Sequence, residues 1–160
     1  GPLIRARDAM RVSDAILAAG ADGARLLGQD AGKRDGNFVR PAVVADVTPS
    51  MQIYREELFG PAIGFIPFTN LDEAIAGAND TNYGLAAGLF TENLDTAMYI
   101  ARKVKSGIMH INSGSRWRVD HMPNGGLKDS GIGKEGPRYA IEDMTESRTV
   151  IMHLKNRAPY

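Results

Sequence analysis

Two segments of the sequence carry side chains whose types and spacing could bind a small molecule. The first is EELFGP, from Glu56 to Pro61, in which two adjacent carboxylates and a phenylalanine precede an apolar stretch. A carboxylate at the end of a strand in an α/β sheet can accept two hydrogen bonds from ribose hydroxyls, and a nearby phenyl ring can pack against a planar ring. Judged by residue types alone, a plain turn is the favoured interpretation.

The second segment is SGSRWRVDHMPNGG, which brings cationic and aromatic side chains within six positions: Arg116, Trp117, Arg118 and His121. Planar cationic and aromatic groups at this density suit a pocket for an anionic or polar small molecule. A cluster of surface salt bridges is the competing interpretation, and the residue types do not decide between them. No two histidines of the chain have metal-ligand spacing, so we expect no metal site.

A third candidate is GIGKEG, from Gly131 to Gly136, which matches the G-x-G-x-x-G pattern of dinucleotide-binding folds. That motif requires a strand before it, a helix after it and an acidic residue about 20 positions later. The preceding residues, GGLKDS, do not have the pattern of a strand, and Glu146 lies too near. The sequence therefore favours a glycine-rich turn that leads into a helix.

The composition limits the function classes. The chain has 160 residues, 19 basic and 19 acidic side chains and no cysteine, which excludes a cysteine nucleophile or a thiolate zinc site within it. The balanced charge and the lack of a long apolar run argue against nucleic acid or a membrane as a partner. The start, GPLIRARD, has neither a secretory pattern nor an initiator Met. We expect a cytoplasmic protein, and a processed or excised piece of it.

The elements that must position these side chains alternate between helix and strand patterns, which predicts an α/β fold with a largely parallel sheet. The predicted helices lie near residues 9–19, 71–78, 94–104 and from Pro137 onward, with Asn70, Glu73 and Asn93 as capping residues. The predicted strands are residues 43–47, 63–68, 85–90, 108–111 and 149–154, and the predicted loops are residues 28–40 and 112–136.

Together these segments resemble the distal part of the catalytic domain of the NAD(P)-dependent aldehyde dehydrogenases, over nearly the whole chain. The resemblance is carried, in order, by GPLI, FVRPAVVADVTPSM, EELFGP, ANDTNYGLAAGLFT, GIMHIN and NGGLKDSGIGKEG. It implies a three-layer α/β/α fold with a mostly parallel sheet. It also implies that residues 1–144 belong to the catalytic domain and that residues 145–160 form an oligomerisation strand and tail.

The resemblance also implies roles for individual residues. It assigns the nicotinamide ribose of NAD or NADP to Glu57 and the nicotinamide ring to Phe59, and it places the aldehyde pocket at Asn112, Trp117, Arg118, His121 and Asn124. Members of the family oxidise an aldehyde to a carboxylic acid through a cysteine thioester. Because that cysteine and its general base belong to regions before Gly1 in the family pattern, we expect no catalytic residue in this chain and no activity from it alone.

One departure from the family pattern bears on the substrate. Asn124 stands where the family usually has an aromatic residue, and Arg118 is close in sequence, so we expect a small polar or anionic aldehyde. By the same resemblance, the strand from Thr149 to Leu154 pairs with a neighbouring subunit in a homodimer or homotetramer. Two other functions stay open: a non-catalytic assembly module that pairs this strand with full-length subunits, and a nucleotide-binding domain that uses GIGKEG.

Overall fold

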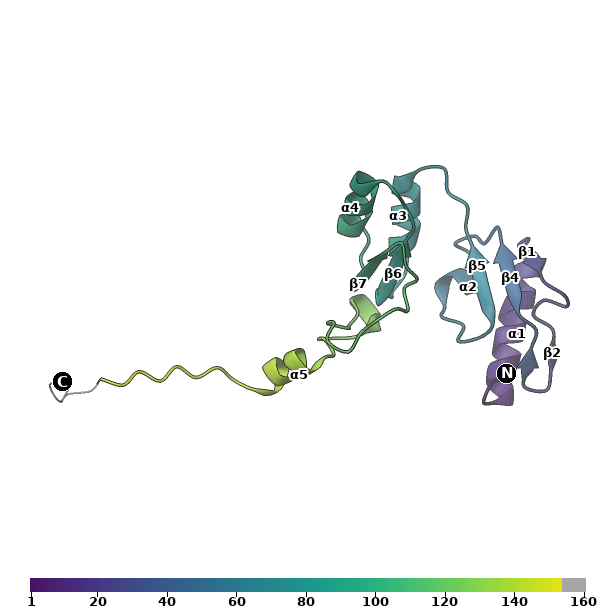
Figure 1. The fold of residues 1–160 in the computed structure, drawn as a ribbon. Coiled ribbons are helices and arrows are strands. Elements are labelled where there is room, and N and C mark those ends of the chain that lie inside the picture. Colours follow the sequence, from purple (N-terminus) through teal and green to yellow (C-terminus); the bar gives the residue numbers. More distant parts are fainter. Residues whose placement is uncertain (154–160) are drawn as a thin grey trace. The chain divides into compact units, whose positions relative to one another are not determined.

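The computed structural model describes residues 1–153 and divides the chain into two compact units, Gly1–Ala74 and Ile75–Tyr160 (Figure 1). Each unit combines helices with strands, which confirms the α/β class. Within residues 1–153, no helix is long and apolar enough to cross a bilayer. The predicted catalytic domain of residues 1–144 ends where the last described helix, α5 (Pro137–Met144), ends.

The first unit is built on helix α1 (Ala6–Ala21), which contacts strand β4 (Ala42–Ala45). The apolar residues that recur three or four positions apart along this helix are all buried, as the pattern predicts: Ala9, Val12, Ile16 and Ala19. They form one core with Val44 and Met51, both of which are fully buried. This core supports the turn that carries EELFGP.

The sheet of the first unit is mixed. β4 pairs in parallel with β5 (Ala62–Phe65) and antiparallel with β1 (Arg25–Leu27). Two neighbouring parallel strands need a crossover connection of a dozen or more residues, which is usually a helix. The connection from β1 to β4 contains no helix, in keeping with their antiparallel pairing. The prediction of a loop over residues 28–40 was wrong in part, because β2 (Arg34–Asp35) and β3 (Phe38–Val39) form a short hairpin there.

Strands β6 (Ala86–Leu89) and β7 (Ile108–Ile111) of the second unit pair in parallel, and helix α4 (Leu94–Lys103) connects them. The predicted crossover is thus confirmed. Asn93 caps α4 by accepting a hydrogen bond from the Thr96 N–H at 2.9 Å, as its position predicts. β5 pairs with β4, and β6 with β7, so the described strands form separate sheets with both parallel and antiparallel pairs.

Helix α3 (Leu71–Asn79) begins at the end of the first unit and continues into the second. Its C-terminal residue joins it to the end of α4, because the Asn79 Nδ2 donates to the Lys103 carbonyl at 2.9 Å and its Oδ1 accepts from the Lys105 N–H at 2.7 Å. One amide side chain therefore satisfies the carbonyl of the last residue of α4 and an N–H just beyond it, where the helix itself offers no partner.

The long segment after β7 has little regular structure, as predicted. It contains only the 3₁₀ turn η1 (Lys128–Ser130) before α5, which starts with Pro137 at its first position. Residues 149–153 form no strand within the described part of the chain, and Val150, Ile151 and Met152 are 71%, 73% and 78% exposed. Leu154, the end of the predicted strand, lies outside the described residues, and its pairing with a neighbouring subunit stays a prediction.

Candidate functional site

The turn that carries Glu57 and Phe59 lies between α2 (Gln52–Arg55) and β5. Leu58, the residue between Glu57 and Phe59, anchors this turn. Leu58 is buried, and its carbonyl accepts a hydrogen bond from the Arg11 Nη2 at 2.7 Å. Gly60 packs so closely on Val12 that a Cβ there would collide with that side chain. With the backbone fixed on both sides, Glu57 and Phe59 are both exposed on the same turn.

Phe59 adopts φ 48°, a left-handed conformation that is unusual for a bulky side chain. The residue is 80% exposed. It lines an open hollow of about 540 Å³ together with residues of the chain's beginning: Pro2, Leu3, Ile4, Arg5, Asp8 and Arg11. Backbone strain of this kind tends to occur where a protein holds a ligand. An exposed ring on a strained turn, beside an exposed carboxylate, fits the contact that the sequence predicts for a nicotinamide and its ribose.

Asn112 directly follows β7 and has φ 57°, a conformation that asparagine tolerates. Its amide forms two hydrogen bonds with the backbone of Thr91, which follows β6. The Asn112 Oδ1 accepts from the Thr91 N–H at 2.8 Å, and the Asn112 Nδ2 donates to the Thr91 carbonyl at 2.9 Å. In this structure the amide therefore joins the ends of the two parallel strands. Its predicted contact with an aldehyde stays a prediction.

Trp117 packs edge-on against His110, with ring centroids 6.4 Å apart and an interplanar angle of 87°. His110 lies in β7 and is 7% exposed, so it is a buried residue of this strand. Its Nε2 has no hydrogen-bond partner among the described residues. The contact fixes one side of the indole, whereas the residue as a whole is 58% exposed and its other surface faces outward. His121, four residues further along, is exposed.

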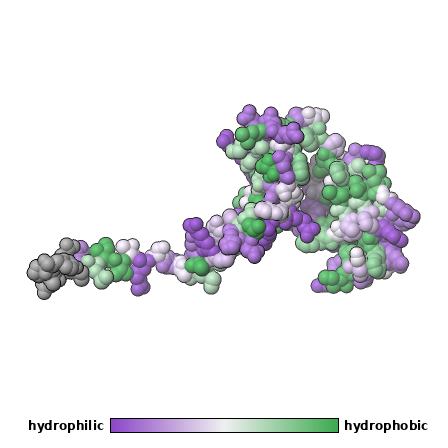
Figure 2. Space-filling view, in the orientation of Figure 1, coloured by the Kyte–Doolittle hydropathy of each residue, from purple (hydrophilic) through white to green (hydrophobic). Residues whose placement is uncertain are grey.

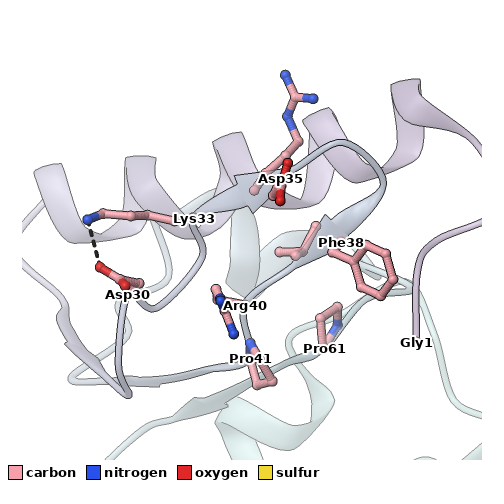
Figure 3. A pocket seen from close by; sticks show the side chains of 10 residues that line it. Gly1, Asp30, Lys33, Asp35, Phe38, Arg40, Pro41 and Pro61 are labelled. Carbon is pink, nitrogen blue, oxygen red and sulfur yellow. Dashed lines mark hydrogen bonds and ion pairs between the residues drawn. The ribbon is translucent and has the colours of Figure 1, made fainter.

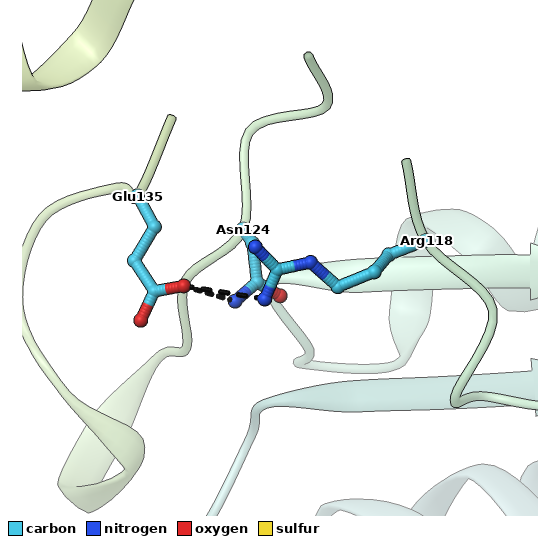
Figure 4. Close-up of polar contacts among 3 residues, drawn as sticks. All are labelled: Arg118, Asn124 and Glu135. Carbon is cyan, nitrogen blue, oxygen red and sulfur yellow. Dashed lines mark hydrogen bonds and ion pairs between the residues drawn. The ribbon is translucent and has the colours of Figure 1, made fainter. Parts of the chain in front are cut away.

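Arg118 and Asn124 meet at the carboxylate of Glu135, and we call these three residues the Glu135 cluster (Figure 4). The Glu135 Oε2 accepts a hydrogen bond from the Asn124 Nδ2 at 2.9 Å and forms an ion pair with the Arg118 Nη1 at 3.3 Å. The Asn124 hydrogen bond, and then the Arg118 guanidinium, hold the pKa of Glu135 below its ordinary value. The carboxylate is therefore ionised at neutral pH.

The sequence did not single out Glu135. It lies 11 residues after Asn124 and 17 after Arg118, inside the GIGKEG motif. The only signal was the motif itself, which its spacing assigned to a turn. The structure therefore brings together Arg118 and Asn124 of the predicted aldehyde pocket, and it adds Glu135 as their shared partner.

A second hollow, of about 480 Å³, lies beside the β2–β3 hairpin (Figure 3). Charged side chains of both signs line it, including Lys33, whose Nζ is 2.7 Å from the Asp30 Oδ1. This ion pair lowers the pKa of Asp30. Because Asp30 and Asp35 line the hollow together with Lys33, Arg34 and Arg40, its lining shows no clear preference for a ligand of either sign. Across residues 1–153 no group of three or more side chains is arranged to bind a metal ion.

Comparison with known proteins decides the family. A sequence model of the aldehyde dehydrogenase family matches residues 1–150. The chain belongs to the aldehyde dehydrogenase family. This confirms the resemblance carried by EELFGP and the segments around it, and the matched range includes GIGKEG.

Relatives of this aldehyde dehydrogenase chain include the 3-sulfolactaldehyde dehydrogenase of Priestia aryabhattai, which is 46% identical over 96% of this chain and 32% of that protein. Aldehyde dehydrogenase 21 of Physcomitrella patens, solved with the reaction product succinate, matches with a TM-score of 0.89 and 38% identity over 95% of this chain and 31% of that one. The glyceraldehyde-3-phosphate dehydrogenase of Methanocaldococcus jannaschii, solved with NADP, has a TM-score of 0.83 and 38% identity over 90% of this chain and 31% of that one. The chain spans about a third of the length of these relatives.

Proposed function

We propose that this chain forms the nicotinamide-ribose contact and part of the aldehyde pocket of an enzyme that oxidises a small polar or anionic aldehyde to a carboxylic acid. The observation that carries the proposal is the Glu135 cluster, which holds Arg118 and Asn124 at one carboxylate. By the family resemblance, Asn124 stands where an aromatic residue is usual. The reactive cysteine of the family would lie outside this chain, which has none and covers about a third of its relatives. The chain alone would then be inactive.

NAD or NADP is the cofactor that the family and the first unit support. The exposed Glu57 carboxylate can accept hydrogen bonds from two ribose hydroxyls, and the exposed Phe59 ring can pack against the nicotinamide. When bound, the nicotinamide accepts the hydride that leaves the aldehyde carbon. The anchoring of Leu58 and the close packing of Gly60 keep both contacts in place without a change of backbone conformation.

The charge of the pocket points to the class of aldehyde. Arg118 presents a planar cation, which matches the geometry of carboxylate, sulfonate or phosphate groups. 3-Sulfolactaldehyde and glyceraldehyde 3-phosphate, which appear in the names of two relatives, each carry an anionic group and a hydroxyl group, and succinate is a dicarboxylate. All three compounds are small and polar, in keeping with a pocket that lacks an aromatic side chain at Asn124.

Steady-state kinetics of the intact enzyme test the proposal. In Arg118→Ala we expect the KM for succinate semialdehyde to rise about tenfold, because a charged hydrogen bond to the substrate is lost. The KM for propanal should stay near its original value. Arg102→Ala removes an exposed arginine in the last turn of α4, outside the candidate pocket, and is the matched control, for which both KM values should be unchanged. Equal effects of Arg118→Ala on the two aldehydes would rule out a role in substrate charge recognition.

A second candidate, a non-catalytic assembly module, draws on a different observation. Residues 149–153 are exposed and form an extended stretch of chain (Figure 1), and three consecutive apolar side chains lie in the middle of this segment. An extended segment with free backbone groups can add a strand to the sheet of another subunit. We infer a homodimer or homotetramer assembled through residues 149–154. Such assembly is compatible with either function, so aldehyde turnover decides between them.

A further inference from the structure

The GIGKEG motif supports the loop that carries Asn124. The Asn124 N–H donates to the Glu135 carbonyl at 3.2 Å, and the Glu135 N–H donates to the Asn124 carbonyl at 2.6 Å. The Lys134 Nζ also donates to the Gly125 carbonyl at 2.8 Å. A Cβ at Gly125 would collide with the Gly133 carbonyl oxygen, so glycine is required for the two segments to approach this closely. The motif thus fixes the backbone at the position where Asn124 projects.

The Glu135 carboxylate fixes which way the Asn124 amide faces. An ionised carboxylate can only accept hydrogen bonds, so the amide must present its NH₂ group to Glu135. The Asn124 Oδ1 then faces away from that carboxylate (Figure 4). An amide oxygen in this orientation can accept a hydrogen bond from a hydroxyl group of a ligand.

The same carboxylate oxygen restrains Arg118. The arginine side chain is 47% exposed, and a long exposed side chain without a partner would sample many rotamers. Its contact with Glu135 uses Nη1, and the guanidinium has five N–H donors in a rigid planar fork. Fixing one terminal nitrogen therefore orients the remaining donors. Figure 4 shows Arg118 and Asn124 approaching the carboxylate from the same side, so the two polar groups are held next to each other.

We propose that Glu135 is a positioning residue that sets two specificity groups at once, the Arg118 guanidinium for an anionic group and the Asn124 amide oxygen for a hydroxyl group. The substrate that this pair fits is an aldehyde that carries both groups. This inference rests on the proposed function of the chain in aldehyde oxidation. Glu135 acts through Arg118 and Asn124 and has no contact with the reacting carbon in this arrangement.

The test measures KM and kcat of the intact enzyme with three aldehydes. Propanal has neither group, 2-hydroxypropanal has only the hydroxyl and succinate semialdehyde has only the anion. In Glu135→Ala we expect the KM for the last two to rise about three- to tenfold, as for the loss of a hydrogen bond to a charged group. The KM for propanal and all three kcat values should be unchanged. Glu135→Gln, whose amide oxygen still accepts a hydrogen bond, should recover part of the loss.

The matched control is Glu142→Ala, which removes the carboxylate of another exposed arginine pair, in which the Arg138 Nε is 2.9 Å from the Glu142 Oε1. This variant should keep the original constants for all three aldehydes. A similar rise in KM for propanal in Glu135→Ala would reduce Glu135 to a general structural role and overturn the inference. A fall in kcat for propanal would place Glu135 in the chemistry instead and would also overturn it.

Two further outcomes are informative. A lower KM for succinate semialdehyde in Glu135→Ala would overturn the inference, because it would mean that Glu135 competes with the substrate for Arg118. If the unsubstituted enzyme oxidises these aldehydes and Glu135→Ala has the same KM values as the unsubstituted enzyme, only the positioning role fails. If it oxidises none of the three aldehydes, the proposed function fails and the inference fails with it.

Discussion

Phe59 has a backbone conformation that its own side chain disfavours. Among the non-glycine residues with positive φ, the others are Asp, Asn or Lys, and of these Asp and Asn tolerate the left-handed region well. Phe59 is held there by its neighbours, since Leu58 is buried and bonded to Arg11 while Gly60 packs against Val12. The exposed ring is therefore positioned by the fold before any ligand binds, which reduces the ordering cost of binding.

The prediction for this turn concerns Glu57. In Glu57→Gln we expect the KM for NAD or NADP to rise about three- to tenfold, because a neutral amide accepts hydrogen bonds from ribose hydroxyls less strongly than a carboxylate. The KM for the aldehyde should change little. Glu56→Gln makes the same change one residue earlier, on a side chain whose Oε2 already accepts from the Gln52 Nε2 at 2.8 Å. The measurement is steady-state kinetics with the cofactor concentration varied. An equal KM for the cofactor in Glu57→Gln and Glu56→Gln would contradict the assignment of the ribose contact to Glu57.

Single residues of the site were predictable to different degrees. Glu57, Phe59, Arg118 and Asn124 could be singled out as candidates because each lies in a short segment with a recognisable pattern, and their roles stay predictions. Glu135 was missed because its partners are 11 and 17 residues away, and the backbone pairing that joins them depends on the path of an irregular loop. The bonds of Asn112 to Thr91 could not be predicted either, since these residues are 21 positions apart and join the ends of two paired strands.

At the scale of elements, the start of α3 shows how sequence sets a helix boundary. The Asn70 Oδ1 accepts from the Glu73 N–H at 2.9 Å, as the capping pattern predicts. The Glu73 Oε2 accepts from the Thr69 N–H at 2.8 Å and from the Thr69 Oγ1 at 2.7 Å, one residue earlier than a standard capping box. These bonds hold the pKa of Glu73 below its ordinary value, with the Thr69 N–H as the largest cause.

This boundary predicts a pH-dependent effect on stability. Because the pKa of Glu73 is lower in the folded protein than its ordinary value of 4.5, its stabilisation is fully present above pH 4.5 and is lost as the pH falls through the lowered pKa. Glu73→Gln should therefore lower the Tm at pH 7, and the difference from the original protein should shrink towards pH 3. Glu92→Gln, at another exposed glutamate, is the control. Thermal melts that show a constant difference at both pH values would contradict this account.

Helices and the β6–α4–β7 crossover were predictable because their signals are local: apolar spacing, caps and turn residues within a few positions. The β2–β3 hairpin was not, since its two-residue strands, Arg34–Asp35 and Phe38–Val39, are too short to show a period of two. The separation of β5 from β6 was equally invisible, because strand pairing depends on contacts between residues far apart in sequence.

At the scale of the whole molecule, both units leave large apolar side chains exposed (Figure 2). On β5, Ile63 and Phe65 are 55% and 53% exposed, and the apolar residues of the C-terminal segment 149–153 are more exposed still. Large exposed apolar side chains that lie together are commonly sites of contact with another polypeptide or a ligand. The division of the chain into two compact units falls between Ala74 and Ile75, inside the predicted catalytic domain of residues 1–144. Its boundaries stay a prediction.

The C-terminal segment carries the last prediction. Ile151 is 73% exposed at the centre of an extended stretch, so a lysine there can be accommodated within the chain itself. If this stretch adds a strand to a neighbouring subunit, Ile151→Lys would bury an unpaired charge in the interface or on its sheet. We expect the assembly to shift to a smaller mass in size-exclusion chromatography with light scattering. Ile132→Lys, at a fully exposed isoleucine in a glycine-rich turn, is the matched control and should keep the original mass. An unchanged mass in Ile151→Lys would place the subunit contact elsewhere, with the exposed face of β5 as the next surface to substitute.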